Sequence, residues 1–165
     1  MMPNAIVYTS NTGYTRQYAL MLAKQTGLPV YSLEESVARL PAGNSIIYLG
    51  WLMAGKVQGY PKAAKRYPIA ALCGVGMMPT GTQVSQLRKA NHLPESLPVF
   101  PLQGGFSLDR LHGIHKAMMT LMVKALTNKN ARTPEEADML SLLQGGSRVS
   151  QENLQAVLDW YTSSH

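Results

Sequence analysis

Cysteine is almost absent from this sequence, and long apolar runs are missing altogether. The single cysteine, Cys73, excludes an internal disulfide and any zinc or iron–sulfur site that needs four thiolates. No uncharged apolar run approaches the roughly 18 residues that a membrane-spanning helix requires. The first residues, Met1-Met2-Pro3-Asn4, lack the basic start of a signal peptide, so we expect a cytoplasmic protein.

Several catalytic and cofactor motifs are also missing. There is no G-x-S-x-G, no H-E-x-x-H and no G-x-x-x-x-G-K-[ST], the motifs of hydrolase elbows, zinc proteases and P-loops. The run from Gly74 to Pro79 lacks the third glycine of a dinucleotide fingerprint, so we expect no NAD. His112 and His115 alone are too few ligands, and we expect no metal site.

Acidic residues are fewer than basic ones, nine against fifteen, and the net charge is +6. All but one of the basic residues precede Thr133. A basic surface suits an acidic partner, anionic lipid or solvent alone. Basic and aromatic residues are not interleaved, so we expect no nucleic-acid partner.

Apolar runs of strand length alternate with helix-like segments along most of the chain. The pattern predicts strands at 4–9, 29–32, 45–49, 69–74 and 98–103, and helices at 13–25, 33–39, 60–66, 82–91 and 108–126. The runs 46–49 and 69–73 are continuously apolar, as in strands that are buried on both faces. We therefore predict an α/β fold with a doubly wound, five-stranded parallel sheet. Glycines at the predicted strand ends then gather at the edge where such sheets bind ligands.

We expect one domain over residues 1–165, with extra helices from about residue 133. Thr133-Pro134 followed by two glutamates is typical of a helix start, and Ser150 precedes a last helix at 154–161. The helix at 108–126 carries a methionine-rich apolar stripe. That stripe packs against the sheet or forms a contact with a partner, a membrane surface or a second copy in a homodimer.

The stretch from Ser10 to Thr15 lies between the first predicted strand and the first predicted helix. A helix that begins there directs its free N–H groups and the positive end of its dipole at the turn. The turn supplies four hydroxyl groups and one amide, with a glycine among them: Ser10, Asn11, Thr12, Gly13, Tyr14 and Thr15. Together these groups form a cradle for a phosphate. Without an internal lysine or arginine, it suits a monophosphate held by neutral donors.

The same stretch satisfies the pattern [ST]-x-T-G-x-T, and with it the sequence resembles the flavodoxin family. The resemblance implies a flavodoxin-like sheet of strand order 2-1-3-4-5 and bound FMN, whose phosphate the residues Ser10 to Thr15 would line. The run Gly50 to Gly55, the turn Gly104-Gly105-Phe106 and the methionine-rich helix look like one branch of that family. This branch is related to the flavodoxin-like protoporphyrinogen dehydrogenases.

The resemblance also implies two turns that contact the flavin ring. The turn after the third predicted strand would cover one ring face, with Trp51 stacking on it. Its implied residues are Trp51, Leu52, Met53, Ala54 and Gly55. The turn after the fifth strand would lie at the ring edge, where glycines allow close backbone approach. Its implied residues are Gln103, Gly104, Gly105 and Phe106, in place of the acidic residue and tyrosine that are common in the family.

The expected function is an FMN-binding, flavodoxin-like redox protein that transfers electrons between redox partner proteins. One alternative is an FMN-dependent oxidoreductase of the protoporphyrinogen dehydrogenase type, with a peripheral membrane or quinone-linked partner. A second alternative is a flavodoxin fold without bound cofactor. No residue is identified as catalytic, although Tyr14 and Tyr60 are the nearest acid–base groups to the expected ring.

Overall fold

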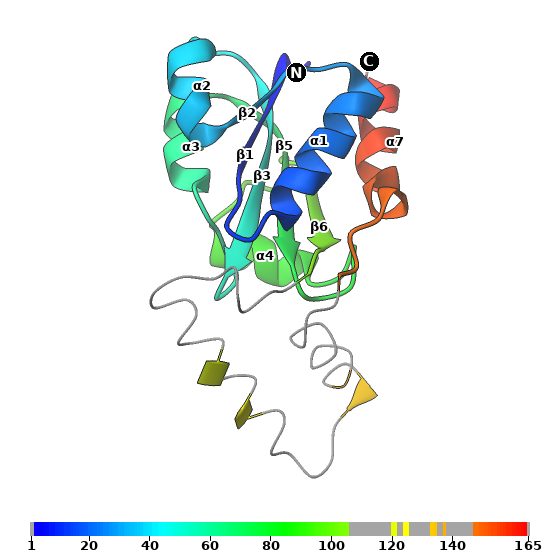
Figure 1. The fold of residues 1–165 in the computed structure, drawn as a ribbon. Coiled ribbons are helices and arrows are strands. Elements are labelled where there is room, and N and C mark those ends of the chain that lie inside the picture. Colours follow the sequence, from blue (N-terminus) through cyan, green and yellow to red (C-terminus); the bar gives the residue numbers. More distant parts are fainter. Residues whose placement is uncertain are drawn as a thin grey trace.

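The computed structural model describes residues 2–105, 120–121, 124–125, 133–134, 137 and 147–164. Strands alternate with helices along the described chain (Figure 1). The strands are β1 (Ala5–Thr9), β2 (Val30–Ser32), β3 (Ile46–Met53), β4 (Lys56–Val57), β5 (Ile69–Gly76) and β6 (Val99–Gln103). The helices are α1 (Tyr14–Thr26), α2 (Leu33–Arg39), α3 (Tyr60–Arg66), α4 (Val84–Ala90), the 3-10 helix η2 (Gln151–Leu154) and α7 (Gln155–Ser164).

Five strands form one parallel sheet in the order β2-β1-β3-β5-β6, and the short β4 pairs antiparallel with β3. The predicted α/β class and parallel sheet are therefore confirmed. Because β2 and β3 lie on opposite sides of β1, the direction of winding reverses there, and open α/β sheets bind ligands at such a point. The outer strands are poor templates for another chain, since β2 has three residues and β6 contains Pro101.

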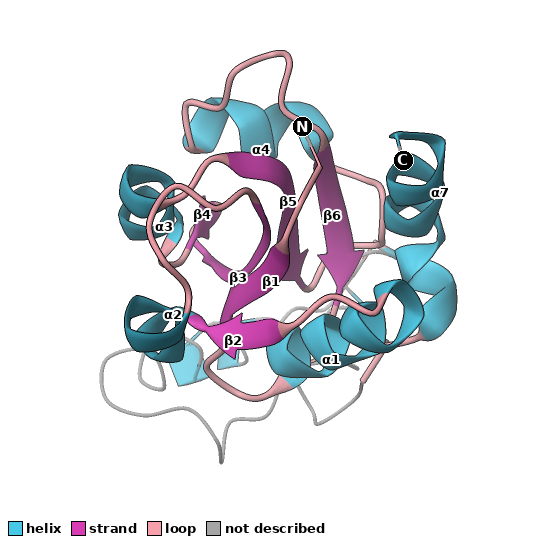
Figure 2. Cartoon of the chain, turned by 90° about the horizontal axis from the view of Figure 1, so that it is seen from above, coloured by secondary structure: helices cyan, strands magenta, loops and turns pink. Residues whose placement is uncertain are grey.

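Helices cover both faces of the sheet (Figure 2). We call the face that α1 and α7 cover the α1 face, and the face that α2, α3 and α4 cover the α4 face. The helix residues buried on the α1 face include Tyr18, Leu22 and Val157. Those buried on the α4 face include Leu33, Ala63 and Leu87. Side chains alternate between the two faces along a strand. In β3, Ile47 and Leu49 therefore pack into the core on the α1 face, whereas Ile46 and Tyr48 pack into the core on the α4 face.

The helix boundaries follow local signals in the sequence. Helices α2 and α3 have the predicted bounds, and α1 is displaced by a single residue at each end. At the start of α2, Ser32 Oγ accepts from Glu35 N at 3.1 Å and the Glu35 carboxylate accepts from Ser32 N at 3.2 Å, which is a capping box. Helix α1 ends at Gly27, which adopts φ +77° and donates its N–H to Ala23 O at 2.8 Å.

Two strands are longer than predicted, because their glycines were interpreted as strand ends. Strand β3 continues through Gly50 to Met53, and β5 continues through Gly74 to Gly76. Gly50 lacks a side chain because a Cβ there would lie 2.5 Å from Val57 Cγ1 and 2.6 Å from Gln58 O. A Cβ at Gly76 would lie 2.8 Å from Leu52 Cδ1. These glycines permit close packing inside the sheet instead of ending it.

The predicted loop at 50–56 is consequently a β-hairpin. Strands β3 and β4 pair Met53 with Lys56 and leave Ala54 and Gly55 as a two-residue connection. Both connecting residues have positive φ, +51° for Ala54 and +80° for Gly55, as a tight hairpin turn requires. The turn expected over Trp51 to Gly55 is therefore shorter than the sequence suggested, because Trp51, Leu52 and Met53 belong to β3.

Gly105, two residues after the end of β6, and Ser147 form an isolated antiparallel bridge. Ser150 precedes the last helices as predicted, and its Oγ accepts from Glu152 N at 3.1 Å. The methionine-rich helix predicted at 108–126 and the helix predicted from Thr133 lie largely outside the described residues. None of the described helices combines the length and the apolar character that crossing a bilayer requires.

Candidate functional site

The turn between β1 and α1 is closed by its own residues. Ser10 Oγ accepts a hydrogen bond from Gly13 N at 3.1 Å. Gly13 adopts φ +98°, a conformation that other residues rarely take, and its carbonyl accepts from Gln17 N at 3.0 Å. Helix α1 thus begins at Tyr14 with no side-chain cap on its first N–H groups. With thirteen residues, α1 directs the positive end of a substantial dipole at this turn.

A buried tyrosine holds the strand that leads into the turn. The Tyr48 hydroxyl lies 2.7 Å from both Thr9 Oγ1 and Gln58 O. A carbonyl cannot donate, so Tyr48 donates to Gln58 and accepts from Thr9. Burial raises the pKa of Tyr48 to about 12, although the contact with Thr9 acts in the opposite direction. Gly59 passes so close that a Cβ would collide with Tyr48 Oη and Thr9 Oγ1. The Ser10–Gly13 turn therefore starts from a fixed position.

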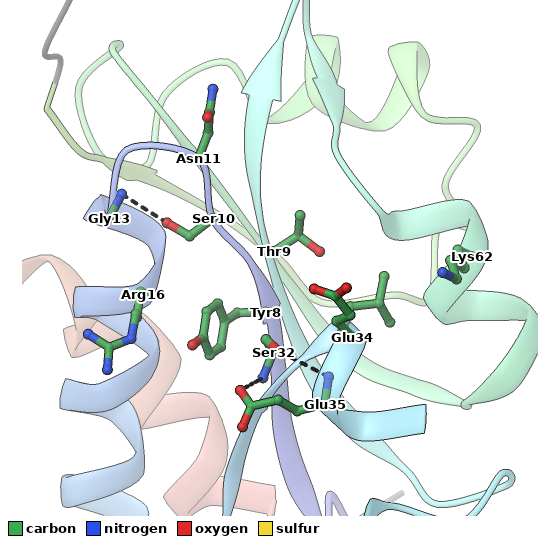
Figure 3. Close-up of a pocket in the computed structure, with 11 residues that line it drawn as sticks. Tyr8, Thr9, Ser10, Asn11, Gly13, Arg16, Ser32, Glu34, Glu35 and Lys62 are labelled. Carbon is green, nitrogen blue, oxygen red and sulfur yellow. Dashed lines mark hydrogen bonds between the residues drawn. The ribbon is translucent and has the colours of Figure 1, made fainter. Parts of the chain in front are cut away.

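An open groove of about 660 Å³ runs beside the turn, and we call it the charged groove (Figure 3). Ser10, Asn11 and Gly13 line one end of it. Four charged residues also line it: Arg16, Glu34, Glu35 and Lys62. All four are exposed, so water screens their mutual interactions. The groove therefore offers hydroxyl groups, backbone amides and both signs of charge.

The acidic residues of the groove were not part of the sequence-based prediction. Hydrogen bonds from Ser32 hold the pKa of the Glu35 carboxyl below its usual value, with Arg39 and Arg16 acting in the same direction at longer range. Glu35 is thus kept ionised by its role in the α2 cap. The capping pattern was visible in the sequence. Its location opposite the first turn depends on β2 pairing with β1, which only the fold reveals.

Among the described residues of the turn, Asn11 has a buried side-chain donor without a hydrogen-bond partner, its Nδ2 atom. The side chain lies at the top of the turn and is directed away from Glu34 and Glu35 (Figure 3). A buried amide without a partner costs about 1–3 kcal/mol. The turn therefore holds a donor that an acceptor such as a phosphate oxygen would satisfy.

The residues predicted for the second turn divide between the two faces of the sheet. Trp51 pairs with Val75 of β5, and strand alternation places it on the α1 face together with Leu49. Leu52 lies on the opposite face, where it packs against the α4-face core. Leu52, Ala54 and Gly55 line a separate cavity of about 440 Å³, which we call the α4-face cavity. It shares no lining residue with the charged groove.

The third predicted turn meets the first one. A Cβ on Gly104 would lie 2.8 Å from Val75 Cγ1 and 3.5 Å from Tyr14 Cβ. Trp51, Val75, Gly104 and Tyr14 therefore form a continuous strip on the α1 face at the carboxyl edge of the sheet. The fold thus brings one residue of each predicted turn close to the others. Phe106 lies outside the described residues.

Gln103 has a structural role that the sequence did not reveal. Its side-chain amide donates to Met77 O at 2.9 Å, and its backbone N–H donates to Thr80 Oγ1 at 2.9 Å. It therefore fixes the loop that follows β5. The Gln103 carbonyl accepts from the Tyr18 hydroxyl, whose oxygen in turn accepts from Asn153 Nδ2 at 2.8 Å. Burial raises the pKa of Tyr18, and the Asn153 contact opposes that effect.

The described residues contain no group of three or more histidine, cysteine, aspartate or glutamate side chains that could hold a metal ion. The only described cysteine, Cys73, is fully buried, and this burial raises the pKa of its thiol to about 12. Comparison of the chain with protein-family models, with curated proteins and with solved structures gave no match.

Proposed function

We propose that this chain is a flavodoxin-like protein that binds FMN and transfers electrons between partner proteins in the cytoplasm. The observation that carries this proposal is the hydroxyl-rich turn between β1 and α1, which lies where the winding of the sheet reverses. In this proposal the sheet is a doubly wound sheet of the flavodoxin type. Its strand order is 2-1-3-4-5 if the short β4 is left out and β5 and β6 are counted as the fourth and fifth strands.

The residues of the turn fit a phosphate monoester. The N–H groups at the start of α1 have no side-chain cap, and the helix dipole favours a negative charge beside them. The buried amide of Asn11 supplies a further donor that lacks a partner in the chain. Arg16, in the first turn of α1, adds an exposed positive charge. A phosphate would accept from the Asn11 amide, which has no partner within the described residues, and this supports FMN over a ligand without a phosphate.

The strip of Trp51, Val75, Gly104 and Tyr14 is the surface that would receive the flavin ring. Its four members come from four different segments, namely β3, β5, the start of α1 and the turn after β6, and Gly104 has no side chain to obstruct a ring. FMN, when bound, supplies the one- and two-electron redox chemistry. The chain would bind the ring, orient it and exclude water on one side. The strip contains no carboxyl, imidazole or amine side chain, which favours electron transfer over proton-coupled catalysis.

The charged groove limits how tightly an anion binds. Glu34 and Glu35 face the same space as Arg16 and Lys62, so a phosphate there meets two negative charges as well as two positive ones. Screening by water makes each contribution small. We expect Glu34→Gln to strengthen FMN binding about two- to fivefold, whereas Glu95→Gln, an exposed carboxylate outside the groove, leaves it unchanged. Equal affinities for the two variants would place the phosphate outside this groove.

Two alternatives are each supported by one observation. The α4-face cavity would give an FMN-dependent oxidoreductase of the protoporphyrinogen dehydrogenase type a place for an apolar substrate. The hydrogen bond between Ser10 and Gly13, together with the nearby carboxylates, supports a flavodoxin fold without a cofactor. The cofactor-free alternative leaves the unpaired amide of Asn11 without an explanation, whereas the FMN-dependent oxidoreductase would bind the same phosphate there.

Reduction of the FMN-loaded protein separates these possibilities. An electron carrier becomes reduced by a chemical reductant under anaerobic conditions and passes its electrons to an added protein acceptor within seconds. An enzyme instead consumes porphyrinogen in the presence of a quinone, with repeated turnover. A protein that neither copurifies with flavin nor binds added FMN would contradict both the electron carrier and the oxidoreductase, and it would support the cofactor-free alternative.

A further inference from the structure

The α4-face cavity is a second feature at the carboxyl edge of the sheet, and none of its lining residues belongs to the charged groove. It lies between the β3–β4 hairpin, the end of β5, helix α4 and β6. Its volume of about 440 Å³ is in the range of small-molecule sites, which is roughly 300–1,000 Å³. No charged side chain is among its lining residues, although the chain as a whole is rich in lysine and arginine. The occupant that suits such a lining is uncharged.

The walls of the cavity are held in place by hydrogen bonds. Asn91, at the end of α4, accepts from Val57 N at 2.8 Å and donates to Gly55 O at 2.9 Å and Leu87 O at 2.9 Å. This side chain therefore binds the hairpin as a neighbouring strand would, and it fixes the distance between the hairpin and α4. On the opposite side, Gln103 fixes Met77 and the loop after β5. The cavity is consequently formed before any ligand arrives.

Backbone strain is concentrated around the same cavity. Three described non-glycine residues adopt positive φ: Ala54 at +51°, Gln83 at +66° and His92 at +52°. Ala54 and Gln83 line the cavity, and His92 directly follows Asn91. Such conformations are strained and collect at functional sites, where the surrounding structure imposes them.

The lining of the cavity is mostly apolar. Leu52 and Leu87 fill the space over Gly74, where a Cβ would lie 3.2 Å from both, and Leu52 also covers Gly76. Methionine, leucine, alanine and proline side chains make up most of the remaining wall, which suits an apolar ligand. The exposed amides of Gln83 and Gln86 lie at the rim and make no hydrogen bond within the described chain, so they can bind a carbonyl oxygen.

We propose that the α4-face cavity binds an uncharged, apolar molecule that carries a carbonyl group at its edge. This site is distinct from the phosphate-binding turn, and the proposal does not depend on FMN binding. The cavity lies on the α4 face of the sheet, whereas the strip of Trp51, Val75, Gly104 and Tyr14 lies on the α1 face. A ligand in the cavity would therefore be separated from that strip by the sheet.

The test uses coumarin, a flat uncharged lactone, titrated into the full-length protein and followed by two-dimensional nitrogen–proton NMR. We expect saturable shifts of the amides of Gly55, Gly74 and Gly76, and none at Gly13. Gln86→Glu places a carboxylate at the rim and should weaken binding about tenfold, because the ligand would remove water from a charge. The matched control is Ser85→Glu, the neighbouring exposed position outside the cavity lining, which should bind as the unmodified protein does.

Three results would overturn the proposal. They are the absence of saturation at millimolar coumarin, saturable shifts that avoid the three glycines, and equal weakening by both glutamate variants. A second titration with FMN separates this proposal from the proposed function. Competition between FMN and coumarin for the same glycines would make the cavity the flavin-ring site and reject a separate ligand. Coumarin binding to a protein that ignores FMN would leave this inference intact and reject the FMN proposal.

Discussion

Replacing Asn11 by alanine should change stability and ligand affinity in opposite directions. The Asn11 Nδ2 atom is buried without a hydrogen-bond partner, so its removal relieves the folded protein of an unpaired donor. That relief is worth about 1–3 kcal/mol, and the lost packing of the side chain offsets part of it. We expect a net gain of about 1 kcal/mol, which corresponds to about 2–4 °C in melting temperature for a chain of this size.

Ligand binding should respond to the same substitution by weakening. A hydrogen bond to a charged phosphate is worth about 1.5–3 kcal/mol, so FMN should bind Asn11→Ala roughly 10- to 150-fold less tightly. The matched control is Asn4→Ala at the other end of β1, where the side-chain amide is exposed and donates to Asn44 Oδ1 at 2.9 Å. It should leave FMN affinity unchanged.

Two measurements on each purified variant decide the matter: thermal unfolding without ligand, and FMN titration by flavin fluorescence. A fall in the melting temperature of Asn11→Ala would mean that the amide already has a partner in the free protein. Unchanged FMN affinity would mean that the amide does not contact the phosphate. Either result would refute the reasoning about the turn.

Three further predictions concern the scaffold around the site. Tyr48→Phe should lower the free energy of unfolding, measured by urea titration, by about 1–3 kcal/mol, because the Gln58 carbonyl and the Thr9 hydroxyl lose their hydrogen-bond partner. A loss below about 0.5 kcal/mol would contradict the buried network. Asn91→Ala should lower that free energy by a similar amount because Val57 N–H loses its acceptor, and hydrogen exchange at Val57 would show whether the hairpin loosens. Native Cys73 should not react with a disulfide reagent at pH 8. Its folded pKa of about 12 exceeds the ordinary 9, so stability from its neutral thiol is complete below pH 9 and is lost as the pH rises towards 12; a flat stability profile over that interval would contradict this.

The parallel sheet was predictable because its strands carry strong local signals. Continuous apolar runs at Ile46–Leu49 and Ile69–Cys73 indicated strands buried on both faces, and the structure buries both runs. The ends of β3 and β5 were not predictable from glycine content. A glycine that turns the chain and a glycine that admits a neighbouring side chain look the same in a sequence, and only the approach of Leu52 to Gly76 distinguishes them.

The site was predictable where it depends on neighbouring residues and not where it depends on strand pairing. The turn from Ser10 to Gly13 follows β1 directly, so its position was visible in the sequence. The placement of Glu35 beside that turn results from the pairing of β2 with β1. Trp51 and Leu52 lie on opposite faces of the sheet because side chains alternate along β3, and a loop would not impose that alternation. The features of the candidate site that the sequence did not reveal therefore depend mostly on which strands pair and on which face of the sheet each side chain lies.

The central claim is that the turn between β1 and α1 anchors a phosphate. The most direct measurement compares the dissociation constants of FMN and riboflavin, which differ only in the phosphate, on the same preparation of the full chain. Anchoring by the turn predicts that FMN binds with one-to-one stoichiometry and about 100-fold or more tighter than riboflavin, as several charge-assisted hydrogen bonds require. Equal affinity for the two flavins, or binding of neither, would contradict the account.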